Sequence, residues 1–438
     1  MTTESTPERR HRPWEPRTCG ASTKAERLID IALEEQFAAR LKRLAAAGKK
    51  ARRGGDRERL TVGALILDAF AHSIADTHER DLSIRLGNDW LSGDCFAPVT
   101  VNAGLRDRLG DLAATGWLHV VKGNNHGTGR LTTFKAGPRL VHVAQELSLG
   151  LVDIARPMPD VGEIELRGRK GRSNDVISPE TRERQSFPET EATALLRAQV
   201  SRLNACFASV ELSQAHTEAA PIDLSRRTVR RTFLDGTFDR GGRLGGSAFW
   251  LNLRKDRRRR DLLIAGEPVA EVDLLAALPA IAYGLEGHTM LLDPYSPEAF
   301  DKVDRGPLKT AFVIFLWTEF KRKAGRFPQE VRAGIPSEFT YAHVYDVLRD
   351  HNPIIAHYLG AAEPTGPTLM FHESEIIIEA TLRCYDQGVS CLPLHDALIV
   401  PASKVDEAVS IFSGVFAERF RVAPMITHEV FGEVARHA

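Results

Sequence analysis

Two aspartates stand in apolar segments where a charged side chain is costly. Asp396 lies within LPLHDALIVP (392–401), and Asp273 lies within GEPVAEVDLLAALPAIAYGL (266–285). Both segments read as buried strands, and a buried carboxylate is unfavourable unless a partner compensates its charge. A single such aspartate is commonly a satisfied core residue, but two of them favour a shared divalent cation. Mg²⁺ binds through one or two carboxylates together with water and substrate phosphates.

A cationic helix start lies between the two aspartates in the sequence. The segment DRGPLKTAFVIFLWTEF (304–320) predicts a helix that begins near Pro307, a residue suited to a first helical turn. Arg305 and Lys309 fall at this start, where free backbone N–H groups and the helix dipole already favour an anion. With two carboxylates nearby, this arrangement predicts a triphosphate site. Trp317 falls near the same helix face and could stack on a base, although core packing explains it equally well.

The remaining pattern predicts a chain of several parts. Residues 1–22 are polar and basic and are expected to be a disordered tail, followed by a domain at 23–150. Within that domain, residues 99–137 read as a helix followed by a hairpin, which is typical of a winged helix that binds nucleic acid. The alternative is a small helical domain whose hairpin only packs. Residues 151–190, rich in Pro, Gly, Arg and Ser, are expected to be a linker before a compact unit at 191–438.

The charge is balanced overall but unevenly distributed. Residues 1–60 hold 15 Lys and Arg against 9 Asp and Glu, and residues 222–260 hold 12 against 4. Such basic stretches indicate contact with a polyanion, or simply solvated helix faces. The 5 cysteines form no CxxC pair, so we expect no disulfide framework and no zinc site. Such a cysteine pattern fits a reducing cytoplasm best. No apolar run approaches the roughly 20 residues of a membrane span, so we expect no membrane contact.

Four segments, taken in order, resemble the polymerase domain of family A DNA polymerases and phage-type single-subunit RNA polymerases. RGGRLGG (240–246) resembles their TGR or RGR segment, and RRRRDLLIAGEPVAEVD (257–273) resembles the run before their first catalytic aspartate. The Arg-x₃-Lys helix and the HD hairpin follow. The resemblance covers about residues 190–438 and implies an α+β fold, the right-hand polymerase. Its palm has an antiparallel sheet, and its fingers and thumb are helical. The thumb would span about 191–225, the palm 226–290 and 371–438, and the fingers 291–370.

The resemblance also implies a role for each site residue. Asp273 and Asp396 would hold two Mg²⁺ ions, with Mn²⁺ as an alternative. Arg305 and Lys309 would grip the triphosphate, and Lys309 could also protonate the leaving group. Trp317 and Leu278 would lie at the nucleotide. Contacts to nucleic acid are expected from five residues: Gly242, Arg243, Arg258, Arg259 and His395. His395 could instead orient Asp396.

This chain departs from the family pattern at positions that bear on sugar choice. Leu278 stands where the DNA enzymes carry a Glu that blocks the ribose 2′-hydroxyl, and Ala397 follows the HD pair where those enzymes usually have Glu. Trp317-Thr318 replaces an aromatic-Gly pair. Residues 1–190 show no acidic cluster of a 3′–5′ exonuclease, so proofreading is not expected.

The sequence therefore predicts a nucleotidyltransferase that extends a strand on a DNA (or RNA) primer–template with nucleoside triphosphates. A DNA product is favoured over RNA, in replication, repair or a mobile element of a bacterium or phage. The N-terminal domain could also bind a protein partner. The alternatives are an RNA polymerase or primase-like activity, template-independent addition, and a catalytically silent palm in a DNA-binding replication or regulatory protein. An unrelated HD-type metal phosphohydrolase would need further ligands among His343, His351, His357 and His372.

Overall fold

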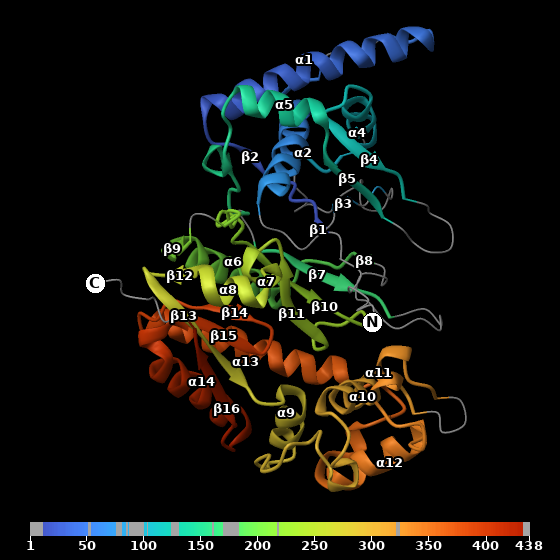
Figure 1. Cartoon of the computed structure of the whole chain (residues 1–438), viewed down its shortest axis with the longest axis vertical. Helices are drawn as coiled ribbons and strands as arrows, with labels where there is room; N and C mark the ends of the chain where they lie inside the picture. The colour runs from blue at the N-terminus through green and yellow to red at the C-terminus, as the bar shows by residue number, and fades with distance from the viewer. Residues whose placement is uncertain are drawn as a thin grey trace, which may run out of the picture. The chain divides into compact units, whose positions relative to one another are not determined.

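The chain divides into two compact units of mixed α+β structure (Figure 1). The computed structural model describes residues 12–50, 54–75, 81–84, 86, 100–102, 104–123, 131–159, 162–169, 184–216, 219–320 and 325–431. The first unit comprises Met1–Glu163, Thr190–Val229 and Gly246–Leu262, and the second comprises Ile164–Glu189, Arg230–Gly245 and Leu263–Ala438. Within the described residues, no helix combines the length and apolar character needed to cross a bilayer.

The first unit packs helices against a small sheet. Its helices are α1 (Thr23–Ala46), α2 (Asp56–Ile74), α4 (Leu105–Ala114), α5 (Pro138–Glu146), α6 (Glu191–Ser209), α7 (Phe249–Asn252) and α8 (Lys255–Asp261). The sheet has the order β1 (Arg12–Pro13), β3 (Leu82–Ile84), β5 (Thr132–Ala136) and β4 (Leu118–Val121). The helix and returning strands predicted for 99–137 are present as α4, β4 and β5. The predicted hairpin tip, residues 124–130, lies outside the described residues.

Residues 12–22 differ from the disordered tail that composition predicts. They contain β1 and β2 (Cys19–Gly20), and β2 pairs with β6 (Ile154–Ala155). Trp14 is buried in the core of the first unit, where its Nε1 donates to the carbonyl of Ala64 at 3.2 Å. Burial of this large aromatic side chain stabilises the segment, although its average composition is polar. Residues 1–11 of the predicted tail lie outside the described part of the chain.

A buried arginine explains why the units do not follow the predicted boundaries. Arg156, in the expected linker, is buried and pairs through Nη2 with Asp68 of α2 at 3.0 Å. Its Nη1 donates to Asp223 at 3.0 Å. Because these charges are buried and stabilise one another, removal of any one of them would be costly. The triad therefore fixes residues around 223 to the N-terminal helices, although the sequence predicts a single unit from 191 onward.

The second unit is built on a sheet in which β13 (Glu267–Leu274) is central. Strand β13 pairs antiparallel with β15 (Ala397–Pro401) on one side and with β16 (Ile426–Val430) on the other. Strand β14 (Leu392–Leu394) forms a hairpin with β15, and β12 (Leu262–Ile264) pairs with the start of β13. A second sheet has the order β11 (Gly241–Gly246), β10 (Val229–Phe233), β7 (Ile164–Arg167) and β8 (Arg184–Gln185). Part of the predicted linker thus forms strands.

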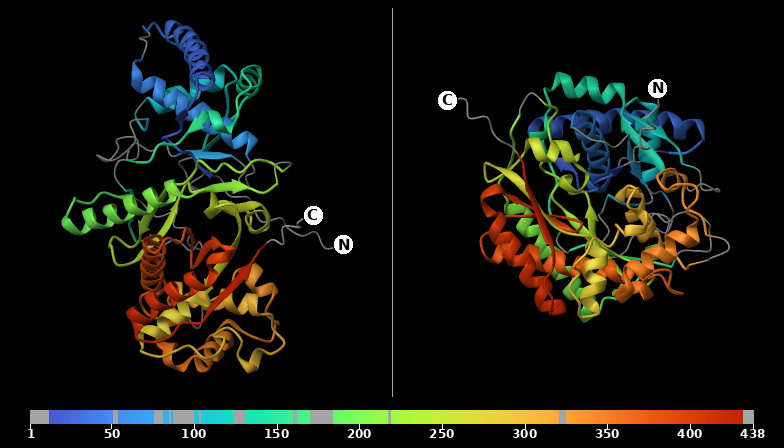
Figure 2. Two further views of the ribbon diagram at one scale, coloured as in Figure 1. Left: turned by 90° about the vertical axis from the view of Figure 1, so that its left-hand side faces the viewer. Right: turned by 60° about the horizontal axis from the view of Figure 1, so that its bottom comes forward.

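Helices cover the central sheet and form the largest apolar core. They are α9 (Ala277–Leu285), α10 (Arg305–Trp317), α11 (Gln329–Ala333), α12 (Tyr341–His351), α13 (Gly366–Asp386) and α14 (Val405–Phe420). Helices α13 and α14 pack against each other and against the β13–β15 strands (Figure 2). Core residues from all of these elements are fully or nearly fully buried, among them Val272, Phe312, Ile377 and Phe416. This burial holds the end of β13 and the start of α10 in one packed body.

The RGGRLGG segment requires glycine because β11 passes close to a buried arginine. Gly242 has a φ of +74°, and a Cβ there would lie 2.8 Å from Nη2 of Arg231 and 2.9 Å from Oγ of Ser374. Arg231 is fully buried, donates from Nε to the Gly242 carbonyl at 3.0 Å, and pairs with Glu375 at 2.7 Å. Close packing therefore explains the glycine at position 242, which the sequence predicts to contact nucleic acid.

We expect Gly242→Ala to lower the free energy of unfolding by about 3 kcal/mol, since it adds a clash to an unfavourable positive φ. Gly266→Ala is the matched control, because Gly266 has a φ of +76° but no neighbouring atom within 4 Å of an added Cβ. This control should lose only about 1 kcal/mol. Urea midpoints of the two full-length variants give the comparison, and equal losses would show that the close approach to Arg231 contributes nothing.

Candidate functional site

The two aspartates of the sequence prediction meet at one end of the central sheet. In the antiparallel pairing of β13 with β15, Asp273 lies opposite Ala397, the residue that follows Asp396. The N–H of Leu274 donates to the carbonyl of Asp396 at 3.2 Å. His395 and Asp396 are the two turn residues between β14 and β15. The strand register therefore brings together two acids that are far apart in the sequence.

Neither aspartate is buried, which corrects the premise that their burial demands a partner. Both residues are partly exposed, although Oδ1 of Asp273 is itself buried, whereas Val272, Ala397 and Leu398 beside them are buried. Asp273 lies near the end of its strand and Asp396 lies in a turn, so both are less buried than the apolar residues around them suggest. Their accessibility suits binding of a solute cation better than a closed core position would.

His395 adopts a backbone conformation that is unusual for its residue type. It is exposed and has a φ of 57°, in the left-handed region, at the first position of a two-residue hairpin where glycine is favoured. A side chain there costs about 1–2 kcal/mol. The presence of a histidine in this unfavourable backbone conformation, directly before Asp396, supports the hypothesis that this turn is functional.

The donor set at the sheet end fits a hard divalent cation. Carboxylate oxygens are the ligands that Mg²⁺ prefers, and two partly exposed carboxylates leave room for the water and phosphate oxygens that complete its shell. Within the described ranges, no group of three or more His, Cys, Asp and Glu side chains is placed to hold a metal ion. The histidine-rich cluster of a metal phosphohydrolase is therefore not found there. His351 instead contacts the carbonyl of Asp293, and His372 contacts Arg419.

A buried carboxylate that sequence reasoning missed lies in the same unit. Glu373 of α13 is buried and accepts a hydrogen bond from Nε of Arg243 at 2.9 Å. Burial raises the pKa of Glu373, Arg243 offsets part of this effect, and the charge of Asp396 adds to the increase. The signal was present in the sequence, because Glu373 shares a helical face with buried Ile376 and Ile377.

Arg243 is therefore engaged by protein, although the sequence predicts that it holds the primer–template. Its side chain remains 32% exposed beside Glu373. The ion pair fixes the guanidinium on β11, and the exposed part is what a nucleic acid could reach. Its predicted contact with nucleic acid stays a prediction.

Helix α10 begins at Arg305, close to the predicted start, and presents two cations in its first turns. The guanidinium of Arg305 pairs with both carboxylate oxygens of Asp293, at 2.5 and 3.2 Å, and lies 4.8 Å from the centre of the Tyr295 ring. Lys309, one turn further along, is exposed, and its side chain makes no hydrogen bond or ion pair with any residue that the structure describes. Lys309 is thus available to an anion as it stands.

The charged groups of α10 and of the sheet end act on one buried phenol. Burial raises the pKa of Tyr295, and the neighbouring Arg305 opposes that increase. The charges of Asp293, Asp396 and Glu373 add to the increase. Charges from the start of α10 and from the sheet end therefore both act on the Tyr295 hydroxyl.

Trp317 and Leu278 lie in packing positions. Trp317 is partly buried, and a Cβ on Gly366 at the start of α13 would lie 2.7 Å from its Nε1. Leu278 of α9 packs against the core of the second unit. Their predicted contacts with a nucleotide stay predictions, and packing alone accounts for the presence of each side chain.

Arg258 and Arg259 lie on α8 and belong to the first unit, whereas the two aspartates belong to the second. Arg258 is buried and donates from Nη1 to the carbonyl of Leu253 at 3.0 Å, and Arg259 is partly buried. Little of Arg258 is left for a nucleic acid, because the arginine run folds as a short helix whose interior face includes it.

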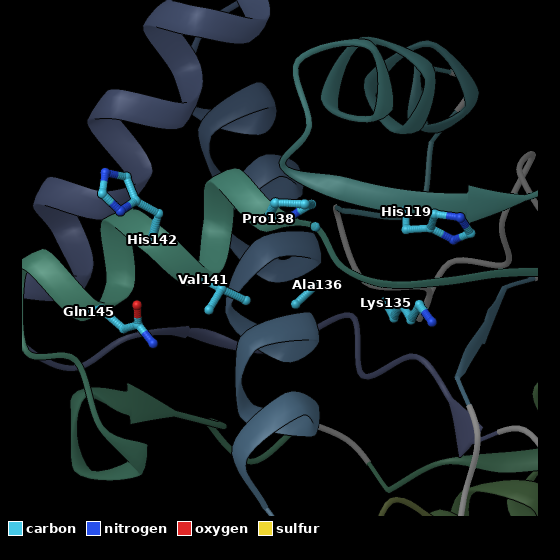
Figure 3. A pocket seen from close by; sticks show the side chains of 8 residues that line it. His119, Lys135, Ala136, Pro138, Val141, His142 and Gln145 are labelled. Atoms are coloured by element: carbon cyan, nitrogen blue, oxygen red, sulfur yellow. The ribbon is translucent and has the colours of Figure 1, made fainter.

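A shallow groove of about 520 Å³ lies in the first unit, between the β4–β5 hairpin and α5 (Figure 3). It is lined by His119, Lys135, Ala136, Gly137, Pro138, Val141, His142 and Gln145. His119 and Lys135 face each other across the two strands. The lining has an apolar floor and no carboxylate, so it could accept an anionic surface.

No known family model matches this sequence, and no curated protein matches it. Among solved structures, the chain is similar to the POL domain of Pol1 from M. smegmatis, determined in a complex with DNA primer-template and dNTP. The two are 11% identical, with a TM-score of 0.31, and the match covers 94% of this chain. It covers 66% of that chain, so this protein spans about two thirds of its length. The likeness is distant.

Removal of Arg243 should expose how strongly Glu373 depends on it. We expect Arg243→Met to lower the free energy of unfolding by about 3 kcal/mol, because it leaves a buried carboxylate without its counter-ion. Adding Glu373→Gln to this variant should restore most of the loss. Urea denaturation of the two single variants and the double variant measures the coupling energy between Arg243 and Glu373. Additive changes in the free energy of unfolding would show that the ion pair does not stabilise the fold.

The raised pKa of Glu373 also predicts a dependence of stability on pH. The folded state holds this proton more tightly than the unfolded chain does, so the contribution of Glu373 to stability is greatest at low pH. As pH rises above the ordinary glutamate value of 4.5, the wild type should lose stability relative to Glu373→Gln. Urea midpoints of both proteins, taken between about pH 4 and 8, test this, and parallel curves would contradict it.

Proposed function

We propose that this chain is a nucleotidyltransferase that extends a nucleic-acid strand by phosphoryl transfer from nucleoside triphosphates. The observation that carries the proposal is the meeting of Asp273 and Asp396 at an accessible sheet end, where the Leu274 N–H bonds to the Asp396 carbonyl at 3.2 Å. A cationic helix start in the same unit supports it. Phosphoryl transfer requires neutralisation of phosphate charge, which a bound cation and these basic side chains would supply.

Asp273 and Asp396 are the residues that would hold the metal ions, proposed as two Mg²⁺ with Mn²⁺ as an alternative. When bound, such ions neutralise phosphate charge and lower the pKa of the attacking hydroxyl. The protein contributes the position of the carboxylates. Asp273 is fixed by pairing of β13 on both sides, and Asp396 is fixed by a tight turn.

Lys309 and Arg305 are proposed to bind the triphosphate. Lys309 is exposed, and its amine carries three donors that can also deliver a proton to the leaving phosphate. Arg305 lies one turn earlier, where the free N–H groups of the helix start favour the same anion. His395, exposed in the turn before Asp396, is proposed to lie beside the end of the growing strand.

The second unit is proposed to be the palm and fingers of a right-hand polymerase. The β13–β15 sheet with β16, α13 and α14 would be the palm, and residues 291–370 with α10 would be the fingers. We propose DNA as the product, because the segments before Asp273 resemble family A most closely. Leu278 brings no carboxylate to exclude a ribose hydroxyl, so any exclusion would rest on its bulk.

The first unit is proposed to bind nucleic acid through its hairpin. Strands β3, β5 and β4 form a small sheet beside α4, as in a winged helix. The groove beside α5 has His119 and Lys135 at its edge and no carboxylate in its lining, which suits a phosphate backbone.

A second candidate function is a catalytically silent palm in a DNA-binding replication or regulatory protein. One observation favours it: the guanidinium groups of Arg243 and Arg305 are both paired with carboxylates, Glu373 and Asp293. Lys309 and the two accessible aspartates favour the enzyme, because a silent scaffold has no physical need for them.

Primer extension separates the two functions. A labelled primer, alone or annealed to a DNA or RNA template, is incubated with Mg²⁺ and either deoxynucleoside or nucleoside triphosphates. We expect extension by the wild type, and a loss of at least about a thousandfold in Asp273→Asn and Asp396→Asn, since each removes a carboxylate that offsets charge at the transferred phosphate.

Asp406→Asn is the matched control, because Asp406 is an exposed acid in the first turn of α14. It should extend the primer at the wild-type rate. Binding of the primer–template is measured for every variant by fluorescence anisotropy. Absence of extension by the wild type under all combinations, with binding intact, would favour the silent palm instead.

A further inference from the structure

Arg305, proposed to bind the triphosphate, is occupied by a carboxylate from a separate segment. Asp293 lies in the loop between α9 and α10, and its two oxygens accept from Nε and Nη2 of Arg305 at 2.5 and 3.2 Å. Two parallel hydrogen bonds of this kind match the planar fork of a guanidinium. A carboxylate or phosphate ligand would use the same donors. Asp293 and an incoming phosphate therefore compete for one binding surface.

Each partner keeps other contacts when the pair separates. The carboxylate of Asp293 also accepts from the N–H of Tyr295 at 3.1 Å and from the hydroxyl of Ser296 at 3.0 Å. The guanidinium of Arg305 lies over the Tyr295 ring, 4.8 Å from its centre. Separation would thus leave the acid hydrogen-bonded and the base on an aromatic face, and neither group would be buried without a partner.

The backbone of the Asp293 loop is fixed independently of Arg305. The carbonyl of Asp293 contacts Nε2 of His351 at 2.9 Å, and the carbonyl of Pro294 accepts from Asn352 at 2.9 Å. Asn352 is buried and also lies 3.3 Å from the hydroxyl of Tyr283 on α9. The carboxylate is therefore held in place while the Arg305 side chain is the part that can move.

The exposure of the pair makes it a weak interaction that a polyphosphate can displace. The side chain of Arg305 is 42% exposed and that of Asp293 is 34% exposed. Ion pairs with this exposure contribute about 0.2–1 kcal/mol, because water screens them. While the pair is formed, the net charge of its two side chains is zero, and the attraction of Arg305 for a triphosphate is reduced.

We propose that Asp293 is a competing counter-ion that neutralises Arg305 in the free protein and sets the affinity of the triphosphate site. This inference rests on the proposed function, because it assigns a role to the residue that faces Arg305 at that site. A triphosphate must displace Asp293 to reach Arg305, and the return of Asp293 favours release of pyrophosphate. The apparent association constant for either anion is its value for the unpaired protein multiplied by the fraction of molecules in which the pair is open.

Binding of inorganic tripolyphosphate to the full-length chain, measured by isothermal titration calorimetry, tests the proposal. We expect Asp293→Asn to bind about two- to sixfold more tightly than the wild type, since an exposed pair competes by about that factor. Asparagine keeps the shape of the turn and an acceptor for the Tyr295 N–H. In an Arg305→Gln background, the same substitution should change the affinity by less than about 1.5-fold, because the competitor then has no target.

Glu407→Gln is the control for the loss of one negative charge. Glu407 is exposed at the start of α14 and pairs with Lys404, so its removal should leave the affinity unchanged. Equal or weaker binding by Asp293→Asn, with a wild type that binds, would overturn the competing role and make Asp293 a residue that orients Arg305. Absence of binding by all of these proteins would overturn the triphosphate site itself, and the competing role with it.

Discussion

The register of β13 between β15 and β16 is the constraint on which the rest of the site depends. Asp273 lies opposite Ala397 on one side and opposite Thr427 on the other. A shift of one residue in either pairing would turn Asp273 to the other face of the sheet and separate it from Asp396. Buried neighbours on β13 and β15, such as Val272 and Leu398, make such a shift costly, because it would expose them.

Helix α13 links this sheet end to the glycine-rich strand β11. Glu373 pairs with Arg243, and Glu375 pairs with the buried Arg231. The two arginines belong to β11 and β10, so the helix neutralises charge on both strands at once. Charge compensation thus recurs through the unit, and the pair of Asp293 with Arg305 is more exposed than either of these two pairs. Buried pairs fix geometry, whereas this accessible pair can yield to a ligand.

Local chemistry made part of this site predictable from the sequence. The HD turn, the strand that bears Asp273 and the start of α10 are encoded by apolar patterns and by Pro307, and the structure has each of them. The partners of the cations were not predictable, because Glu373 and Asp293 reach Arg243 and Arg305 only through tertiary packing. The burial of Arg258 and the ion pair of Arg156 with Asp223 also depend on tertiary packing. For this reason the sequence predicted Arg258 on the surface and a domain boundary at residue 191.

If Asp273 and Asp396 form one cation site, anomalous scattering from Mn²⁺ can locate an ion bound there. Crystals of the full-length chain would be grown with Mn²⁺ and a deoxynucleoside triphosphate, and data would be collected near the manganese absorption edge. We expect an anomalous peak in contact with the carboxylates of both aspartates, and its loss in Asp396→Asn. Manganese bound at other residues, with no peak at the end of β13, would contradict it.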